Sequence, residues 1–292
     1  MLIKRPPHII LASDIAGLGK VATTAALPLL ASCQLEVAVL PTVLLSSHTG
    51  GFPGAFVESY TQGMEQFIQQ WSALEIEFSA LVTGYLRDKK QIELLLELAE
   101  KQELPLIVDP IMGDNERLYA GFDETFVVEM RRLASQAKLL LPNLTESCLL
   151  LNRDYPDQAL TEQDYLEVCQ DLHALGAESI VLTGLPLSET ELGLAFYDGK
   201  SESFQLFSRP RLPQHFFGTG DMVTALLAGA WVQKIPLTKA IPALLDFLQL
   251  AMQTTVEVQP DLRLGVFYQP FLGQWTQQFQ VFLEEKYEKE SL

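Results

Sequence analysis

The feature that most constrains this chain is an alternation of short, continuously apolar segments with longer segments whose apolar residues recur at helical spacing. The short apolar segments lie at residues 79–83, 106–109, 138–141 and 179–183. Segments at 89–101, 126–137 and 163–175 separate them and read as helices. Continuous apolar strands between helices predict a parallel sheet that is covered on both faces.

The rest of the chain fits the same α/β plan. We predict strands at 8–12 and 37–40, the second ended by Pro41, helices at 21–30 and 56–71, and a loop at 42–53. Segments 192–197 and 204–207 flank Asp198 and Gly199 and predict an antiparallel hairpin, and residues 221 to about 251 read as helical. We therefore expect one domain over residues 1–292: a mostly parallel, doubly wound sheet with a small antiparallel edge or flap. The acidic tail at 284–292 should fray in solvent.

The chain is strongly acidic, with a formal net charge of -17 over 292 residues. A surface of this sign repels phosphate polymers, so we exclude nucleic acid as a partner. The N-terminal apolar run is too short for a signal peptide, and no apolar run is long enough to predict a membrane span. The three cysteines, Cys33, Cys148 and Cys169, form no C-x-x-C motif and fit free thiols. We therefore expect a cytoplasmic protein with no membrane partner.

Polar clusters follow the predicted strands and also precede the last helical segment. They lie at residues 13–14, 46–51, 84–88, 109–114, 143–146, 183–184 and 218–221. In open α/β sheets, ligands bind beyond the carboxyl ends of the strands. The sequence therefore predicts one composite site built from these segments.

The last cluster, Gly218, Thr219, Gly220 and Asp221, precedes a long apolar run. Its two glycines let the backbone approach a ligand closely, and a helix start offers free N–H groups to an anion. An acidic residue among these amides can take a proton from a hydroxyl while the amides hold a phosphoryl group. These four residues alone are equally compatible with a plain helix start, with Thr219 as N-cap and Asp221 in the first turn.

This G-T-G-D segment resembles the signature of the ribokinase-like superfamily, and four further segments are similar to motifs of pyridoxal kinases in the same order. Residues 46–50 read S-S-H-T-G against S-N-H-T-G, and residues 83–88 read T-G-Y-L-R-D against T-G-Y-x-R-D. Residues 109–114 read D-P-I-M-G-D against D-P-V-M-G-D, and residues 142–146 read P-N-L-T-E against P-N-x-x-E. The resemblance implies a ribokinase-like kinase that uses ATP and Mg²⁺ to phosphorylate the 5′-hydroxymethyl group of pyridoxal, pyridoxine or pyridoxamine.

The resemblance also implies a role for each matching residue. The catalytic residues would be the general base Asp221 and an anion hole formed by Gly218, Thr219 and Gly220. The vitamin pocket would be lined by Ser13, Ser47, His48, Thr49 and Tyr85, with His48 helping to order its loop. ATP would be bound by Asp114, Asn143, Glu146 and Thr183. The metal would lie near Asp109, Asp114 and Glu146, partly through water. A homodimer is implied as well, and a monovalent cation is left open.

Several of these residues also have a structural interpretation. Asn143 and Glu146 match a capping box before an apolar run, and this role can coexist with ligand binding. Asp109 can simply end a strand, and Tyr85 can be ordinary packing. The roles of four further residues stay open: Lys20, Arg209 and Arg211, which are either phosphate-binding or solvated, and His215.

Two departures from the pyridoxal kinase motifs leave the substrate open. The first loop reads S-D-I-A-G-L-G-K at residues 13–20, and its Ser-Asp start is closer to hydroxymethylpyrimidine kinases of thiamine biosynthesis. Ser47 also replaces the Asn of S-N-H-T-G. One alternative is therefore a hydroxymethylpyrimidine (phosphate) kinase with the same machinery. The alternative from another class is a non-catalytic vitamin-binding protein on this fold, against which the intact Asp221 argues.

Overall fold

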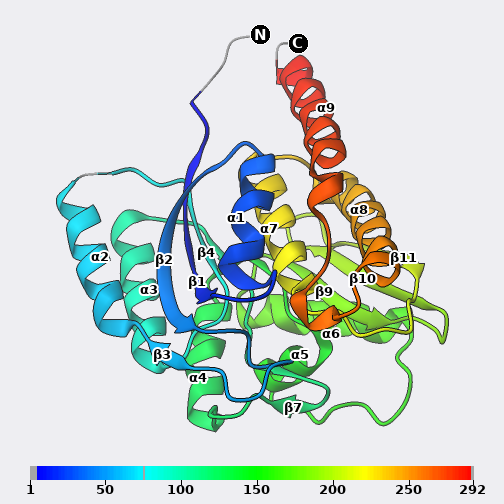
Figure 1. Cartoon of the computed structure of the whole chain (residues 1–292), viewed down its shortest axis with the longest axis horizontal. Coiled ribbons are helices and arrows are strands. Elements are labelled where there is room, and N and C mark those ends of the chain that lie inside the picture. The colour runs from blue at the N-terminus through cyan, green and yellow to red at the C-terminus, as the bar shows by residue number, and fades with distance from the viewer. Residues whose placement is uncertain (1–4, 75, 291–292) are drawn as a thin grey trace.

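The computed structural model describes residues 5–74 and 76–290. Within these residues the main sheet has nine strands in the order β11-β10-β9-β8-β5-β4-β1-β2-β3 (Figure 1). The strands are β1 (His8–Ala16), β2 (Glu36–Leu45), β3 (Val57–Ser59), β4 (Ala80–Thr83), β5 (Leu106–Val108), β8 (Ala137–Leu140), β9 (Ser179–Pro186), β10 (Glu191–Asp198) and β11 (Ser203–Pro210). The six strands from β2 to β9 in this order are parallel, whereas β10, β11 and β3 pair antiparallel. The predicted mostly parallel sheet with an antiparallel edge is confirmed.

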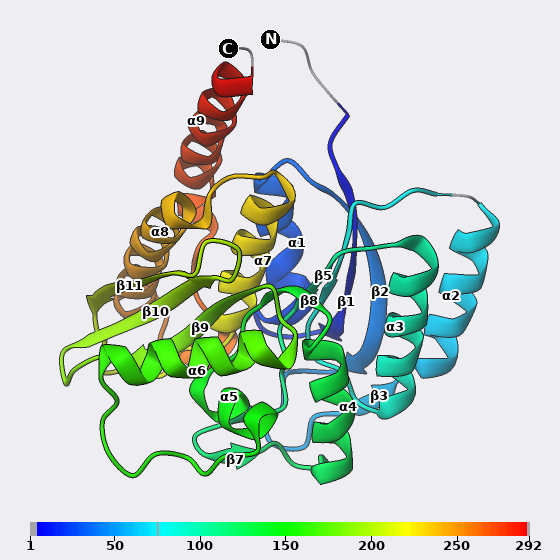
Figure 2. The same cartoon turned by 180° about the vertical axis from the view of Figure 1, so that it is seen from behind.

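Helices cover both faces of this sheet, which Figures 1 and 2 show in turn. One hydrophobic core lies under α1 (Ala22–Ser32), α7 (Thr219–Val232), α8 (Leu237–Val258) and α9 (Leu272–Glu290). The other lies under α2 (Thr61–Ala73), α3 (Lys89–Gln102), α4 (Glu124–Ala134) and α6 (Glu162–Leu175). Side chains alternate along a strand, so β1 supplies Ile9 and Leu11 to the first core and Ile10 and Ala12 to the second. This two-sided burial explains why the strands are apolar throughout.

Smaller elements lie near the carboxyl ends of the parallel strands. Strands β6 (Gly113–Asp114) and β7 (Arg117–Leu118) form a short ribbon, and α5 (Leu144–Leu151) follows β8. Two 3₁₀ turns, Leu262–Leu264 and Gln269–Phe271, connect α8 to α9. None of the helices among the described residues combines the length and apolarity that crossing a bilayer requires.

Local sequence signals set several element ends. Helix α3 begins where the Asp88 side chain accepts a hydrogen bond from the Gln91 backbone N–H, and it ends at Glu103, which is left-handed with φ 53°. The hairpin between β10 and β11 turns after Asp198, as predicted.

Two predicted boundaries near the start of the chain are wrong. Pro41 does not end the second strand, which continues to Leu45, because Pro41 lies beside a register shift in the pairing of β1 with β2. Proline is tolerated at such irregularities. The helix predicted at 56–71 begins only at Thr61, because Val57–Ser59 instead pair with the free edge of β2.

Two predictions near the end of the chain are also wrong. The helical segment from 221 to about 251 is two helices, because Lys234 adopts a left-handed φ of 56° and Pro236 follows before α8 begins. The tail does not fray over 284–290, where α9 continues while Tyr287 packs on the core and Lys239 pairs with Glu285. Residues 291–292 lie outside the described residues.

Candidate active site

The predicted polar clusters meet along the carboxyl ends of the parallel strands. Ala12 pairs with Thr83, Thr83 with Val108, and Val108 with Leu140, so the residues that follow them form one row. That row continues to β9, where Asn143 and Thr183 form an isolated parallel bridge. Segments far apart in the sequence therefore reach the same edge of the sheet, as predicted.

The crevice in this row lies between β1 and β4. From β1 the chain moves to β2 on one side and then to β4 on the other, and ligands bind at such reversals of strand order. Ser13 at this point is buried, and Gly84 packs directly against it. A Cβ added to Gly84 would lie 2.4 Å from Ser13 Oγ, so this position has no room for a side chain. Ser13 therefore faces the strand-reversal crevice.

The G-T-G-D segment forms the start of α7, which points at this crevice. Gly218 is the N-cap with φ 81°, and a Cβ there would lie 2.4 Å from the Lys20 carbonyl oxygen, so only glycine fits. The alternative with Thr219 as N-cap is wrong, because Thr219 is the first helical residue and none of the described side chains caps this helix. Space around the Cα of Gly220 is open. The first N–H groups of α7 are therefore available to an anion.

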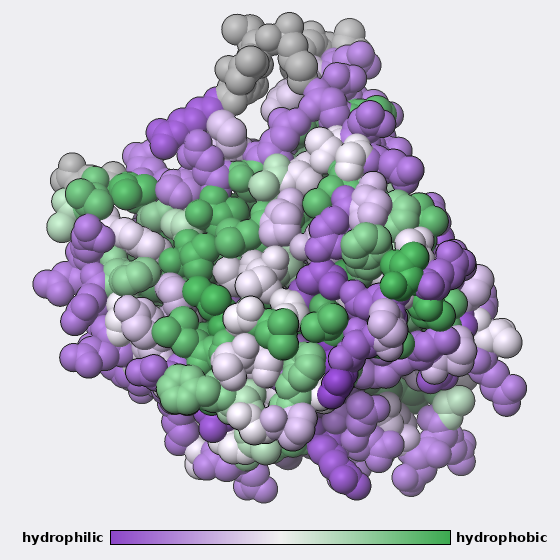
Figure 3. Space-filling model, in the orientation of Figure 1, coloured by the Kyte–Doolittle hydropathy of each residue, from purple (hydrophilic) through white to green (hydrophobic). Residues whose placement is uncertain are grey.

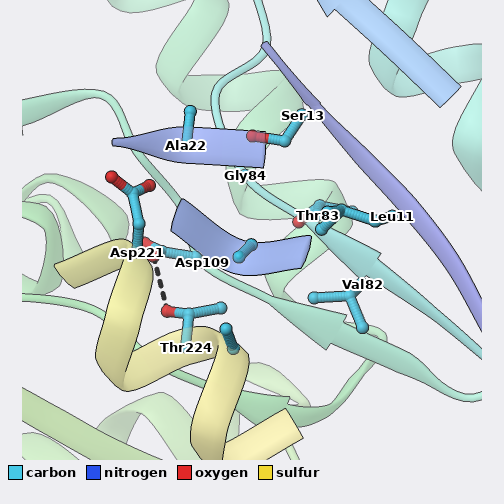
Figure 4. Close-up of a pocket in the computed structure, with 11 residues that line it drawn as sticks. Leu11, Ser13, Ala22, Val82, Thr83, Gly84, Asp109, Asp221 and Thr224 are labelled. Carbon is cyan, nitrogen blue, oxygen red and sulfur yellow. Dashed lines mark hydrogen bonds between the residues drawn. The ribbon is translucent and has the colours of Figure 1, made fainter. Parts of the chain in front are cut away.

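Two aspartates, Asp109 and Asp221, lie at the start of α7 (Figure 4), and Asp14 is close enough to interact electrostatically with Asp221. Burial raises the pKa of Asp221 to about 6, although its carboxylate accepts a hydrogen bond from the Ala22 backbone N–H. Burial and the charge of Asp221 raise the pKa of Asp14 to about 7. Burial also raises the pKa of Asp109 to about 7; Thr224 Oγ1, which donates to Asp109 Oδ2 at 2.6 Å, opposes that rise. The surroundings of these three aspartates therefore disfavour their ionised forms.

The capping box predicted at Asn143 and Glu146 is confirmed at the start of α5. The Glu146 backbone N–H donates to Asn143 Oδ1 at 2.8 Å, and the Asn143 backbone N–H donates to Glu146 Oε2 at 2.9 Å. Glu146 Oε1 also accepts from the Met112 backbone N–H at 3.2 Å, and Asn143 Nδ2 donates to the Gly113 carbonyl at 2.9 Å. The box therefore also fixes the segment that leads to Asp114.

The proposed metal residues fit Mg²⁺ bound together with phosphate rather than a cage made by protein alone. Burial and the nearby Asp109 raise the pKa of Glu146 above its usual range, a penalty that a bound cation would remove. Asp114 turns its carboxylate to Asn115, which donates from its backbone and side chain at 2.8 and 2.9 Å. Over residues 5–74 and 76–290, no three His, Cys, Asp or Glu side chains are arranged to hold a metal. Mg²⁺ suits such a site because it keeps waters and phosphate oxygens as ligands.

The predicted vitamin-binding residues of the loop at residues 46–52 differ in their burial. Ser47 and His48 are buried, and His48 Nε2 lies 2.6 Å from the Arg263 carbonyl oxygen, whereas Thr49 is exposed. Tyr85 is half-buried and its ring lies 5.6 Å from the ring of Phe122. The structure therefore packs Tyr85 against the small apolar cluster that contains Ala22 and gives His48 a backbone partner.

Beneath Asp221 lies a small cavity of about 20 Å³. Figure 4 shows Ser13, Thr83, Asp109 and Asp221 around it, with Leu11, Val82 and Ala22 also lining it. Thr83 Oγ1 is fully buried and has no hydrogen-bond partner among the described residues. A cavity of this volume has room for about one water molecule.

Sequence reasoning missed Tyr119 and Thr224. Burial raises the pKa of the Tyr119 hydroxyl, and the charges of Glu146, Asp114, Asp109 and Asp221 raise it further, so Tyr119 lies among the acids of the site. Thr224 lies one turn beyond Asp221 on α7 and its hydroxyl donates to Asp109. The spacing of Thr224 on a helix after Asp221 was visible in the sequence, whereas the electrostatic influence of Glu146 and Asp221 on Tyr119 was not.

The remaining open residues lie at different distances from this row. Lys20 Nζ donates to Gln259 Oε1 at 3.0 Å, and burial lowers the pKa of Lys20. Arg209 pairs with Asp246, at 2.7 Å between Nε and Oδ1, on the hairpin edge. The ring of His215 contacts that of Phe217, with 4.6 Å between centroids. Of these, Lys20 lies beside the Gly218 turn and Arg209 is engaged elsewhere.

Comparison with known proteins agrees with this geometry: the chain is a phosphotransferase, a kinase with the ribokinase-like fold. It belongs to the phosphomethylpyrimidine kinase family, whose sequence model matches residues 56–263. A pyridoxal kinase from Arabidopsis thaliana is 29% identical over 236 residues, covering 76% of this chain and 74% of that protein.

Two solved structures are similar over nearly the whole chain. Pyridoxal kinase from Lactobacillus plantarum is 31% identical with a TM-score of 0.84, covering 96% of this chain and 98% of that one. A Bacteroides thetaiotaomicron protein assigned as a phosphomethylpyrimidine kinase, crystallised with pyridoxal, is 30% identical with a TM-score of 0.88. The match covers 92% of this chain and 96% of that one.

Proposed function

We propose that this protein transfers the γ-phosphoryl group of ATP to the 5′-hydroxymethyl group of pyridoxal, pyridoxine or pyridoxamine, so that it salvages B6 vitamers. The observation that carries the proposal is Asp221 at the open N-terminus of α7, beside the crevice between β1 and β4. The similarity to pyridoxal kinases and to a relative crystallised with pyridoxal supports the choice of vitamer.

Asp221 is the general base of the proposed mechanism. Its pKa of about 6 leaves it ionised at neutral pH but more basic than an ordinary aspartate, which suits proton abstraction from a hydroxyl. The N–H groups that follow Gly218 hold the transferring phosphoryl group, because a helix start stabilises the charge on its equatorial oxygens. Base and anion hole therefore come from one turn of backbone.

The residues that would hold the metal and the nucleotide lie along the row from β5 to β9. Asp109, Asp114 and Glu146 would hold Mg²⁺, directly or through water, and Asn143 and Thr183 would contact the phosphates. When bound, the metal would neutralise phosphate charge during transfer. On the other side of Asp221, Ser13, Ser47, Thr49 and Tyr85 bind and orient the vitamer.

A second candidate substrate is hydroxymethylpyrimidine or its phosphate. Asp14, next to Ser13 at the crevice, belongs to the Ser-Asp start that is closer to hydroxymethylpyrimidine kinases, and the family model carries the phosphomethylpyrimidine name. Both substrates are flat heteroaromatic alcohols, so the same base and anion hole serve either.

The proposal includes a single kinase domain that works in the cytoplasm as a homodimer. Figure 3 shows apolar residues gathered across the face where α1 and β2 lie, and Leu27 of α1 is 36% exposed there. A second copy of the chain would bury such a surface. Size measurement in solution over a range of concentrations tests this part: a monomer throughout would contradict it.

The experiment that tests the function is ADP formation by the purified protein with Mg²⁺ and each candidate alcohol in turn. Turnover on a B6 vitamer is expected. Turnover only on hydroxymethylpyrimidine would move the protein to the second candidate, and no turnover on any of them by folded protein would contradict both. Repeating the assay with Na⁺ or K⁺ determines whether a monovalent cation is needed.

A further inference from the structure

The connection between α8 and α9 contacts both the β1–α1 loop and the loop at residues 46–52. Its first part, residues 259–265, lies against the β1–α1 loop on one side. The Lys20 backbone N–H donates to the Leu264 carbonyl at 3.0 Å, and Lys20 and Gly265 form an isolated parallel bridge. This contact is made by backbone and is therefore independent of side-chain identity.

A side-chain bridge reinforces this contact. Lys20 Nζ donates to Gln259 Oε1 at 3.0 Å, while Gln259 Nε2 donates to the Gly265 carbonyl at 2.7 Å. One glutamine therefore closes residues 259–265 into a compact turn and attaches that turn to Lys20. The Lys20 carbonyl also lies against Gly218, where a Cβ would approach it to 2.4 Å. Through Lys20, the turn therefore packs against the start of α7.

On its other side the same turn holds the loop at residues 46–52. His48 Nε2 lies 2.6 Å from the Arg263 carbonyl oxygen, and because a carbonyl only accepts, the imidazole donates. His48 is 8% exposed, and its ring lies 4.7 Å from that of Phe217, the residue before Gly218. The contact is therefore shielded from water and adjoins the G-T-G-D segment.

Glycines allow this close approach. A Cβ on Gly51 would lie 2.9 Å from His48 Cε1 and 3.1 Å from Arg263 Cγ, and a Cβ on Gly50 would lie 3.1 Å from Phe217 Cε1. A Cβ on Gly19, whose φ is 102°, would lie 3.1 Å from His48 Cδ2. The His48 imidazole is thus packed between these glycines and the rings of Phe52 and Phe217.

We propose that residues 259–265 act as a clasp that holds the 46–52 loop in register with the start of α7, with His48 and Gln259 as positioning residues. The clasp rests on the proposed function, because the held loop carries Ser47 and Thr49 of the vitamer site. It presents the substrate hydroxymethyl group to Asp221 at a fixed distance. Loosening the clasp therefore weakens vitamer binding and turnover while leaving the nucleotide row from β5 to β9 intact.

The test compares steady-state kinetics of His48→Phe, which keeps an aromatic ring but removes the donor, with His48→Gln, which keeps a donor. For His48→Phe we expect the KM for pyridoxal to rise about tenfold, the scale of one lost buried hydrogen bond, with kcat lowered and the KM for ATP within about twofold of wild type. His48→Gln should recover most of this loss. Gln259→Leu, which leaves His48 untouched, should shift the same constants in the same direction.

His173→Phe is the matched control. His173 Nδ1 also lies 2.7 Å from a backbone carbonyl, that of Ala177, but far from the crevice at the end of α6. Its replacement should lower Tm without changing either KM. An unchanged KM for pyridoxal in both His48→Phe and Gln259→Leu, or an equal rise in both KM values, would overturn the clasp.

Hydrogen exchange separates failure of the clasp from failure of the proposed function, because it requires no turnover. Amides at residues 46–52 should exchange faster in His48→Phe and Gln259→Leu than in wild type, and at the wild-type rate in His173→Phe. Wild-type exchange in the first two variants would overturn the clasp even in an active kinase. Absence of turnover on every vitamer by wild-type protein would instead overturn the function.

Discussion

The carboxyl ends of the central strands and the hairpin edge of the same sheet treat carboxylates in opposite ways. Around the start of α7, burial raises the pKa values of Asp14, Asp109 and Asp221, and the charge of Asp221 raises those of Asp14 and Asp109 further. Beside β9, hydrogen bonds and charge from Lys200 and Lys138 lower the pKa of Glu178. At the hairpin edge, the two lysines stabilise the ionised carboxylate of Glu178. In the crevice, the ionised forms of the three aspartates are destabilised, and a proton or a bound cation would remove that penalty. The destabilised carboxylates therefore distinguish the candidate active site, at the carboxyl ends of the central strands, from the hairpin edge.

The largest expected effect is on turnover and comes from replacing Asp221 in the crevice. Asp221→Asn removes the general base and should lower kcat by roughly 10²- to 10⁴-fold. Because it also removes a charge that raises the pKa of Asp14 and Asp109, it should leave the fold intact and raise Tm without Mg²⁺. ADP release and thermal melts measure the two effects. Near-normal turnover would contradict the assignment of Asp221.

The acid limb of the pH profile sharpens the comparison. Asp221 accepts a proton only when ionised, so kcat/KM should fall about tenfold per pH unit below its pKa of about 6. An ordinary aspartate would place this limb near pH 4. Initial rates from pH 5 to 8 under saturating Mg²⁺ measure it, and a flat profile down to pH 5 would be inconsistent with a base of raised pKa.

Without ligands, the contribution of Asp14 to the free energy of unfolding should change with pH in the direction opposite to that of most acidic groups. Asp14 has a folded pKa of about 7, above its unfolded value of 3.8, so the folded state binds more protons between these values and loses stability as pH rises through them. Asp14→Asn should therefore stabilise the protein at pH 8 by on the order of 4 kcal/mol, because a pKa raised from 3.8 to about 7 costs about 1.4 kcal/mol for each pH unit. Urea unfolding at pH 5 and pH 8 measures the difference. An equal effect at both pH values would rule out this origin.

A smaller effect is expected at the cavity below Asp221. The sign of the stability change on replacing Thr83 shows whether the cavity holds a water molecule. If one water satisfies the Thr83 hydroxyl, Thr83→Val removes that hydrogen bond and should destabilise the fold by about 1 kcal/mol. Thermal melts measure the change, with Thr83→Ser as the control that keeps the hydroxyl. A rise in Tm on replacing Thr83 by Val would mean that the cavity is dry.

The smallest effect belongs to the hairpin edge. Glu178→Gln breaks contacts with Lys138 at 2.9 Å and Lys200 at 2.7 Å, but both lysines are largely exposed. The loss of stability should stay below about 1 kcal/mol and disappear at high salt. Because the folded pKa of Glu178 is lowered, its contribution is present above its unfolded pKa and is lost as pH falls. An altered kcat in this variant would break the separation of the two regions.

The sequence alone determined the alternation of strands and helices, the parallel sheet, and the segments that contribute to the site. These features depend on local chemistry: apolar runs such as 179–183, glycines at a helix start, and the capping pair of Asn143 and Glu146. Motif resemblance then pointed to Asp221 as the base before any contact was known. Local patterns of this kind can be read because neighbouring residues produce them.

Tertiary structure alone decided where strands end and which residues surround Asp221. Pro41 stays within β2, and Val57–Ser59 became a strand, because neighbouring strands offered partners that local propensity does not reveal. The raised pKa of Asp14, through Asp221, and the contact of His48 with Arg263 each join residues more than 200 positions apart. Burial and electrostatic coupling depend on distance in space, and folding sets that distance.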